Sequence, residues 1–127
     1  NHIETIQNIF RQYNFKRLSY FYFERNFNKI LFNSSFRNCE NLIELDLKRN
    51  QMEKIEPKAF ENLKNLEILR ISYNNLTRLI NQTFFDLQSL IILDIRHNEI
   101  SYIENGTFFG LEKLDLLKLE RNKITEI

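Results

Sequence analysis

Apolar and polar positions recur along this chain with a period of twenty-four residues. Residues 42–65 read LIELDLKRNQMEKIEPKAFENLKN, and shifting the sequence by one period aligns them with LEILRISYNNLTRLINQTFFDLQS, then LIILDIRHNEISYIENGTFFGLEK and finally LDLLKLERNKITEI. The repeated positions form columns of aliphatic residues, an asparagine column and a phenylalanine column: Leu42, Leu66, Leu90 and Leu114; Leu45, Leu69, Leu93 and Leu117; Leu47, Ile71, Ile95 and Leu119; Asn50, Asn74, Asn98 and Asn122; Phe60, Phe84 and Phe108. A fixed period in the twenties is typical of a solenoid.

Within each unit the pattern changes halfway. Leu45, Asp46 and Leu47 alternate between apolar and polar, which predicts one short strand per unit with its leucines inward. Strands of successive units would then pair in parallel. The second half of each unit has no helical periodicity long enough for a proper helix, so we expect turns or a single 3₁₀ turn there.

These columns resemble the extracellular leucine-rich repeat in its twenty-four-residue form, as in Toll-like receptor ectodomains and secreted insect immune repeat proteins. The resemblance implies an α/β fold, a curved horseshoe solenoid with short parallel strands on the concave face and turns and 3₁₀ segments on the convex face. The chain then divides into a partial unit, four full units and a second partial unit: 1–17, 18–41, 42–65, 66–89, 90–113 and 114–127.

Composition favours a single array over residues 1–127, because one proline and two glycines leave no linker. Asn1, Ile3 and Ile6 align with later positions that lie midway through a unit. Repeat arrays need polar caps at their ends, and neither end carries one, nor the cysteine-rich flanking modules usual in the extracellular family. We therefore expect an internal fragment of a longer array, uncapped at both ends.

The first two units depart from the pattern. Ile9 or Phe10, together with Phe15, is expected to fill the convex side of the first unit. In unit 18–41, Asn28 stands where other units carry an aliphatic residue. We expect Phe27 or Ile30 to fill that gap within a locally rearranged turn.

Candidate chemistry is sparse. The only histidines, His2 and His97, lie four units apart, which excludes a dyad or metal cluster built from them. Cys39 takes the position of the leucine column through Leu63 and is expected to be a small buried hydrophobe. No phosphate-binding glycine loop is present, so we expect no enzyme, no cofactor and no metal.

The net charge of +1 favours neither nucleic acid nor membrane contact, and no apolar run approaches the roughly 20 residues of a bilayer span.

Four Asn-x-Ser/Thr sequons are candidate glycosylation sites: Asn33, Asn75, Asn81 and Asn105. All but Asn75 fall at one repeat position, three residues before the phenylalanine column, where asparagine, serine and threonine also suit a turn. Glycosylation at two or more of them would mean passage through the secretory pathway. The expected localisation is extracellular, as a secreted protein or as the ectodomain of a membrane protein.

The outward side chains of the strands form the candidate binding surface. Acids and bases mix there, so binding would depend on shape and local pairing. A row of outward aliphatic residues, Ile68, Ile92 and Leu116, is typical of an interface, although flanking side chains could instead shield residues that simply favour strands. The predicted partner-binding set is Tyr20, Tyr22, Ile68, Arg70, Tyr73, Ile92, Arg96, His97 and Leu116. Phe85 and Phe109 either form a second patch or thicken the core.

The resemblance implies a recognition module, innate-immune or receptor-like, that binds a protein partner or a microbial ligand. The main alternative is a structural matrix or adhesion protein, or one that associates into homodimers or heterodimers. An intracellular scaffold with unmodified sequons is a third interpretation.

Overall fold

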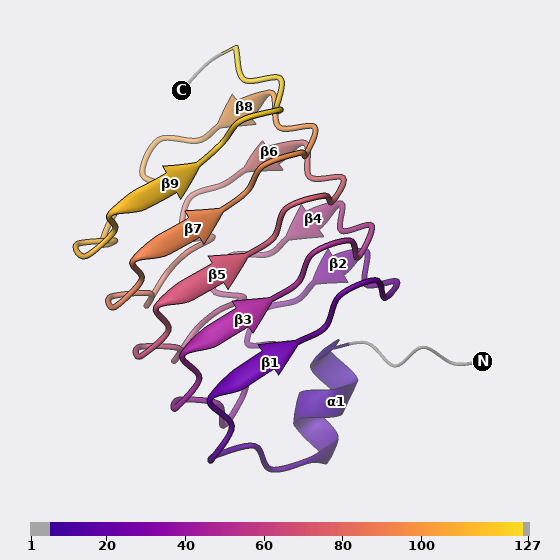
Figure 1. The fold of residues 1–127 in the computed structure, drawn as a ribbon, viewed down its shortest axis with the longest axis vertical. Helices are drawn as coiled ribbons and strands as arrows, with labels where there is room; N and C mark the ends of the chain where they lie inside the picture. Colours follow the sequence, from indigo (N-terminus) through magenta and orange to yellow (C-terminus); the bar gives the residue numbers. More distant parts are fainter. Residues whose placement is uncertain (1–5, 126–127) are drawn as a thin grey trace.

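A computed structural model describes residues 6–125, so the expected mid-unit entry at Asn1 and Ile3, and also His2, lie outside the described residues. One wall of the molecule is a five-stranded parallel sheet in the order β1-β3-β5-β7-β9 (Figure 1). Its strands are β1 (Tyr20–Tyr22), β3 (Glu44–Asp46), β5 (Ile68–Arg70), β7 (Ile92–Asp94) and β9 (Leu116–Lys118). Residues one period apart are paired throughout the sheet. The predicted parallel solenoid and its register are confirmed.

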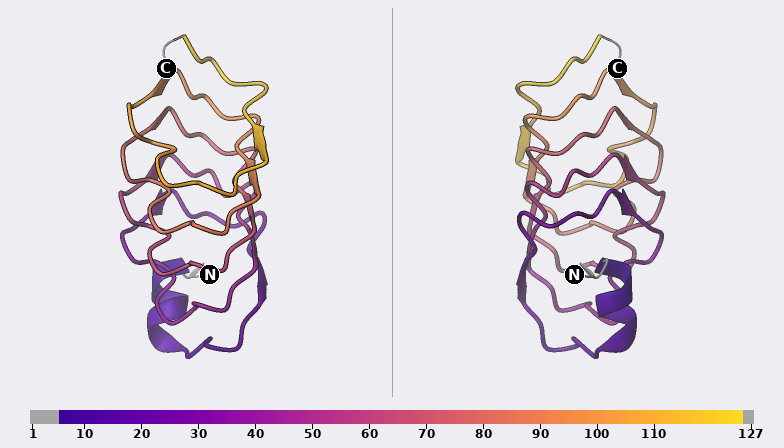
Figure 2. Two further views of the ribbon diagram at one scale, coloured as in Figure 1. Left: turned by 90° about the vertical axis from the view of Figure 1, so that its left-hand side faces the viewer. Right: turned by 90° about the vertical axis from the view of Figure 1, so that its right-hand side faces the viewer.

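The opposite wall carries shorter strands and turns (Figure 2). Two separate pairs lie there: β2 (Ile30–Leu31) with β4 (Lys54–Ile55), and β6 (Arg78–Leu79) with β8 (Tyr102–Ile103). We call this wall the back.

The expected 3₁₀ segments are not formed in residues 6–125, where the chain makes isolated turns instead. On the back, each full unit places residues with positive φ at two fixed positions, for example Lys58 at 61° and Asn62 at 73°. A 3₁₀ helix needs negative φ at every residue, so these positions interrupt it. Both glycines, Gly106 and Gly110, occupy the same two positions with φ of 84° and 89°.

A short helix, α1 (Ile6–Gln12), fills the back of the first unit, where only turns were expected. Ile6 and Phe10 are both buried and lie four residues apart, so one face of a helix turns both into the core. The Phe10 ring contacts those of Phe15 and Phe36 at centroid distances of 4.8 and 5.1 Å. Phe10 and Phe15 therefore fill this unit as predicted, although from a helix and the segment after it.

Two internal columns join successive turns of the solenoid. The rings of Phe36, Phe60, Phe84 and Phe108 stack at 5.9 to 6.1 Å with nearly parallel planes. The Asn74 side chain accepts hydrogen bonds from the backbone N–H groups of Asn50 and Met52, both at 2.9 Å. Its amide donates to the carbonyls of Leu47 and Ile71. Cys39 is fully buried at its predicted leucine position.

The prediction that Phe27 or Ile30 fills the gap at Asn28 is wrong. Phe27 is 57% exposed and Ile30 38%, whereas Asn28 itself points inward and is 3% exposed. Burial is tolerated because the Asn28 oxygen accepts from the Ile6 N–H and its amide donates to the Ile30 carbonyl. The expected rearrangement is present, since the Asn28 N–H donates to the Asn50 carbonyl. In the described structure the Asn50 side-chain oxygen consequently has no partner.

Candidate partner-binding face

The outward side chains of the five-stranded sheet, with the residues just beyond its strand ends, are here called the strand face. In β5 the central Leu69 is buried, while Ile68 and Arg70 point to the other side and are half-buried. β7 repeats this arrangement with Ile92. The alternation therefore places the predicted aliphatic row outside the core.

Exposure along that row is uneven. Tyr20, Ile68, Ile92 and Leu116 share one register position, interrupted by Glu44. Tyr20 and Leu116, at the two ends, are 54% and 42% exposed, and the two isoleucines between them are half-buried. Parallel strands lie about 4.8 Å apart, so each side chain in the row partly covers the next. The row is a shallow apolar strip with accessible ends.

A first polar cluster joins Tyr22, Glu44 and Arg70 across β1, β3 and β5. The Glu44 carboxylate forms an ion pair with the Arg70 guanidinium and lies close enough to the Tyr22 phenol to affect its titration. Partial desolvation, followed by the Glu44 charge and hydrogen bond, raises the pKa of Tyr22. Tyr22 and Arg70, both predicted to bind a partner, are thus held in place by Glu44, which the predicted set did not include. The available signal was an acid one period after Tyr20 and one period before Ile68 in the outward column.

A second cluster fixes Arg96. Its guanidinium donates two hydrogen bonds to the Asp94 carboxylate, at 2.9 and 2.8 Å. Burial acts to raise the pKa of Asp94, but the hydrogen bonds from Arg96 and the charges of Arg96 and Lys118 outweigh it, so this pKa is lowered. Asp94 was also missed. It lies two residues before Arg96, and the same spacing recurs at Asp46 and Lys48, which pair at 3.5 Å.

A third cluster stacks Arg49, Tyr73 and His97 beyond the strand ends. The Arg49 guanidinium carbon lies 4.2 Å from the Tyr73 ring centroid, and the Tyr73 and His97 rings lie 4.2 Å apart at 8°. All three have positive φ, between 55° and 57°, and sit directly before the asparagine column. This shared backbone conformation sets their side chains above one another. Arg49 is a further residue that sequence reasoning missed.

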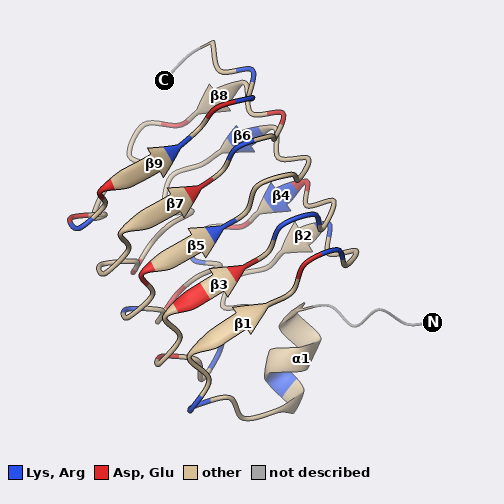
Figure 3. Cartoon of the chain, in the orientation of Figure 1, with Lys and Arg blue, Asp and Glu red and all other residues tan. Residues whose placement is uncertain are grey.

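Charge alternates across the strand face (Figure 3). Most of its bases are already paired, through the Arg70, Arg96 and Lys48 contacts above and through Arg49 with Glu24 at 3.4 Å. Within residues 6–125 no three His, Cys, Asp or Glu side chains gather as metal ligands would. The arrangement offers aromatic, aliphatic and ion-paired anchors on an open surface.

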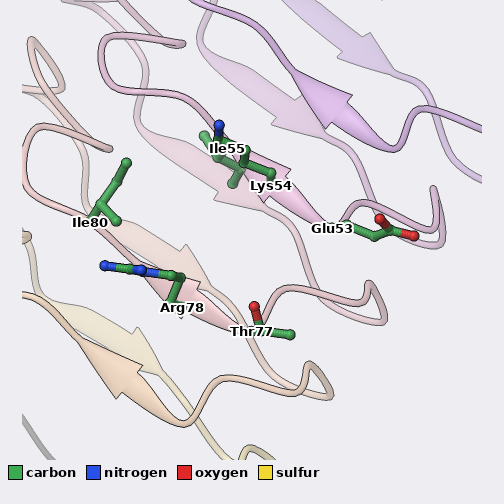
Figure 4. Close-up of a pocket in the computed structure, with 6 residues that line it drawn as sticks. All are labelled: Glu53, Lys54, Ile55, Thr77, Arg78 and Ile80. Atoms are coloured by element: carbon green, nitrogen blue, oxygen red, sulfur yellow. The ribbon is translucent and has the colours of Figure 1, made fainter.

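Several clefts lie away from the strand face. One, of about 410 Å³, lies on the back between β4 and β6 and is shown with its six lining residues in Figure 4. Another, of about 440 Å³, lies beside Phe85 and Phe109. Phe109 is 88% exposed, so it forms a second surface patch and does not thicken the core.

All four sequon asparagines are exposed. The hydroxyls of Ser35, Thr83 and Thr107 are turned inward and donate to the carbonyl three residues earlier. These sequons therefore have a structural reason for their hydroxyl residue. Thr77, in the sequon of Asn75, is exposed, and its hydroxyl makes no such bond in the described structure.

Comparison with known proteins gives a consistent result. The leucine rich repeat family profile matches residues 16–76 and 64–124. The crystal structure of the TLR13-ssRNA13 complex is similar, with a TM-score of 0.79 and 30% sequence identity, over 83% of this chain and 16% of that chain. No curated protein matches the sequence. The helix that the structure describes has neither the length nor the apolarity of a membrane span.

Proposed function

Because the chain belongs to the leucine-rich repeat family, we propose that it is an extracellular recognition module, receptor-like or innate-immune, whose strand face binds a protein partner or a microbial ligand. Leucine-rich repeat and Toll-like solenoids are typically binding modules rather than enzymes. The fold supports a role in recognition in general. The binding surface, the extracellular location and the class of ligand are the parts that we propose.

One observation carries the proposal: three side-chain clusters hold their members in place beside a partly exposed apolar strip. Tyr22 and Arg70 meet at Glu44, Arg96 is fixed by Asp94, and Tyr73 stacks between Arg49 and His97. Tyrosine and arginine are, together with tryptophan, the residue types enriched at binding hot spots. Side chains already ordered in the free protein lose less entropy on binding, which favours affinity.

A protein or microbial surface ligand fits this face better than nucleic acid does. TLR13 is in complex with ssRNA in the similar structure. In this chain, however, the guanidinium groups of Arg70 and Arg96 already pair with carboxylates of the same face. Phosphates would have to displace those carboxylates, whereas a partner with mixed charges can complement both signs.

The test is a double substitution in the apolar strip, Ile68→Glu with Ile92→Glu. Extracellular proteins of the source organism and purified microbial surface polymers would be tested against immobilised chain, with a single-stranded RNA oligonucleotide as a third ligand class. We expect the affinity for the bound ligand to fall at least about thirtyfold, because two charges would replace apolar anchors at the centre of the interface.

The control is Phe109→Ser, which changes a more exposed apolar residue that lies away from the strand face. Circular dichroism of the double variant should match that of the parent chain. Unchanged affinity would place the site elsewhere. RNA as the strongest ligand would refute the ligand class, and concentration-dependent self-association abolished by the same variant would favour the dimerising alternative.

A further inference from the structure

The hydrogen-bond ladder along the back is interrupted at one junction of the described structure. In one neighbouring junction the Glu53 and Lys54 N–H groups donate to the Lys29 carbonyl, and in another the Ser101 N–H donates to the Thr77 carbonyl. The equivalent donors between β4 and β6 are the N–H groups of Thr77 and Arg78. Neither makes a hydrogen bond, and β4 and β6 do not pair.

The acceptors on the other side of this junction are also unused. The carbonyls of Glu53 and Ile55 correspond to those of Thr77 and Leu79, which do accept hydrogen bonds from the next turn, but they receive none themselves. The Ile80 N–H, which would reach Ile55, bonds instead to the Thr83 hydroxyl at 3.2 Å. We call this interrupted junction the seam.

The sequence explains why the seam occurs there. In two neighbouring junctions an asparagine N–H donates to a glutamate of the next turn, Asn33 to Glu56 at 3.0 Å and Asn81 to Glu104 at 3.2 Å. At the seam these positions are Pro57, which has no N–H, and Ile80, whose side chain has no acceptor. The junction therefore lacks a side-chain bond as well as its ladder bonds.

The seam is closed at both ends and open outward between them. The Asn75 N–H donates to the Met52 carbonyl at 2.8 Å at one end, and the Lys58 N–H donates to the Gln82 carbonyl at 3.0 Å at the other. Between these bonds lies the cleft of Figure 4, where Glu53, Lys54 and Ile55 from the β4 segment face Thr77, Arg78 and Ile80 from the β6 segment. Such a gap exposes donors on one edge and acceptors on the other.

Asn75 stands at the mouth of the seam. A further cleft of about 570 Å³ is lined by Asn75 and shares Glu53, Lys54 and Thr77 with the cleft of Figure 4. This volume lies within the roughly 300–1,000 Å³ typical of small-ligand sites. The Asn75 side chain is exposed and makes no hydrogen bond to any residue that the structure describes, so its amide nitrogen is available for modification.

We propose that Asn75 carries an N-linked glycan whose first sugar packs into the seam and replaces its missing hydrogen bonds. In the attachment step the Asn75 side-chain nitrogen bonds to the anomeric carbon of an oligosaccharide carried on a lipid diphosphate. The bond from that carbon to the diphosphate breaks, the lipid diphosphate leaves, and the amide nitrogen loses one proton. The luminal transferase that recognises Asn-x-Ser/Thr supplies both the donor sugar and the catalysis.

Carbohydrate suits this site because hydroxyl groups both donate and accept hydrogen bonds. They can accept from the Thr77 and Arg78 N–H groups on one edge and donate to the Glu53 and Ile55 carbonyls on the other. An acetamido group adds one more donor and acceptor. The inference shares with the proposed function only passage through the secretory pathway, and it makes no use of the strand face.

The test compares the full chain and an Asn75→Gln variant, both produced in a glycosylating eukaryotic host. Peptide mass spectrometry should find Asn75 occupied. Amide hydrogen exchange at Thr77 and Arg78 should be roughly threefold to tenfold slower in the glycosylated chain than in the variant, which corresponds to one net hydrogen bond at each amide. Because the Asn75 side chain makes no hydrogen bond, the variant is expected to fold.

Three further variants separate the effect of the glycan from other causes. Thr77→Ser keeps the sequon and should keep slow exchange at Arg78, whereas Thr77→Ala should lose both the glycan and the protection. Asn81→Gln removes a different sequon and should leave exchange at Thr77 and Arg78 unchanged.

An unmodified Asn75 would overturn the inference, and so would equal exchange rates with and without its glycan. Occupied Asn33, Asn81 or Asn105 beside an empty Asn75 would defeat this inference alone, while no modification in protein from its native source would also remove the support for an extracellular location.

Discussion

At the scale of single residues, the asparagine column supplies hydrogen bonds between successive turns, as backbone groups do in an ordinary sheet. Asn74 uses its oxygen for two N–H groups of the preceding turn and its amide for carbonyls of both turns. Asn26, at the N-terminal end of the column, is half-buried, and within the described residues its amide donates only to the Glu24 carbonyl. The same residue type therefore has different energetic weight at two equivalent positions.

We predict that Asn74→Ala lowers the free energy of unfolding by about 1–3 kcal/mol or more, because buried backbone groups of two turns lose their partners. Asn26→Ala, the matched control, should cost less than about 1 kcal/mol. Urea denaturation of both variants measures the difference. Equal losses would mean that the column does not hold adjacent turns together.

Cys39 illustrates how burial controls reactivity. Burial, with a smaller contribution from the charge of Glu40, raises the pKa of the Cys39 thiol to about 12. Since the thiolate is the reactive form, iodoacetamide at pH 8 should alkylate the folded chain on the order of a thousand times more slowly than the chain unfolded in urea. A raised folded-state pKa also means that stability falls as the pH rises above about 8.5, the ordinary cysteine value. Fast alkylation without denaturant would contradict the buried position.

Asp94 should make stability depend on acid. Its folded-state pKa is lowered, so its contribution is fully present above the ordinary aspartate value of about 3.9 and is lost as the pH falls through the lower folded-state value. Asp94→Asn should therefore destabilise the chain at pH 7 and flatten the loss of stability below pH 4. Thermal unfolding between pH 2 and pH 7 would show this, with the exposed Asp115→Asn as control. Parallel pH profiles for the two variants would argue against the Arg96 contact.

At the scale of elements, very short strands persist because each is one member of a register that repeats. Strands of two or three residues could not form a stable sheet alone. Here they are anchored by inward leucines and by the stacked rings behind them. The stability of these short strands therefore comes from the leucine and phenylalanine columns that run across successive units.

The phenylalanine column can be tested with neighbouring aromatic residues. Phe84 is 1% exposed and stacks on both Phe60 and Phe108, whereas Phe109 is 88% exposed. Phe84→Ala should cost about 3–5 kcal/mol of unfolding free energy. Phe109→Ala should stay within about 0.5 kcal/mol of the parent chain. Chemical denaturation of the pair gives the comparison, and a large loss at Phe109 would show that its patch contributes to folding.

At the scale of the whole molecule, stability is expected to be a sum over turns and over the junctions between them. The seam is then a weak junction inside the array, held by its core contacts and by the bonds at its two ends. Local opening should begin there, since unpaired backbone groups mark the low-stability regions of a fold.

Closing the seam from the sequence side provides a direct test. Pro57→Asn and Ile80→Glu together would recreate the asparagine-to-glutamate bond of the neighbouring junctions. A double-mutant cycle should give a favourable coupling of about 0.5–1.5 kcal/mol, although each single variant is neutral or destabilising. Additive effects would indicate that the two positions do not approach each other.

The sequence by itself determined the solenoid, its register and the members of its internal columns. Burial explains this result. The period of two within strands and the period of twenty-four between units together specify which side chains, such as those of Leu69 and Phe84, are buried. It also placed Ile68, Arg70 and His97 on the outer surface. Whether a side chain points inward or outward depends on its position in the repeat, so the sequence alone is sufficient to predict it.

Only the tertiary structure decided which outward side chains meet. Glu44 joins Tyr22 to Arg70 diagonally, because each lies on a strand next to β3, whereas Arg49 stacks on Tyr73 one period away. The buried Asn28 and helix α1 likewise depend on partners in the neighbouring turn. Such contacts depend on distances of a few ångströms between turns, which hydrophobic periodicity does not encode.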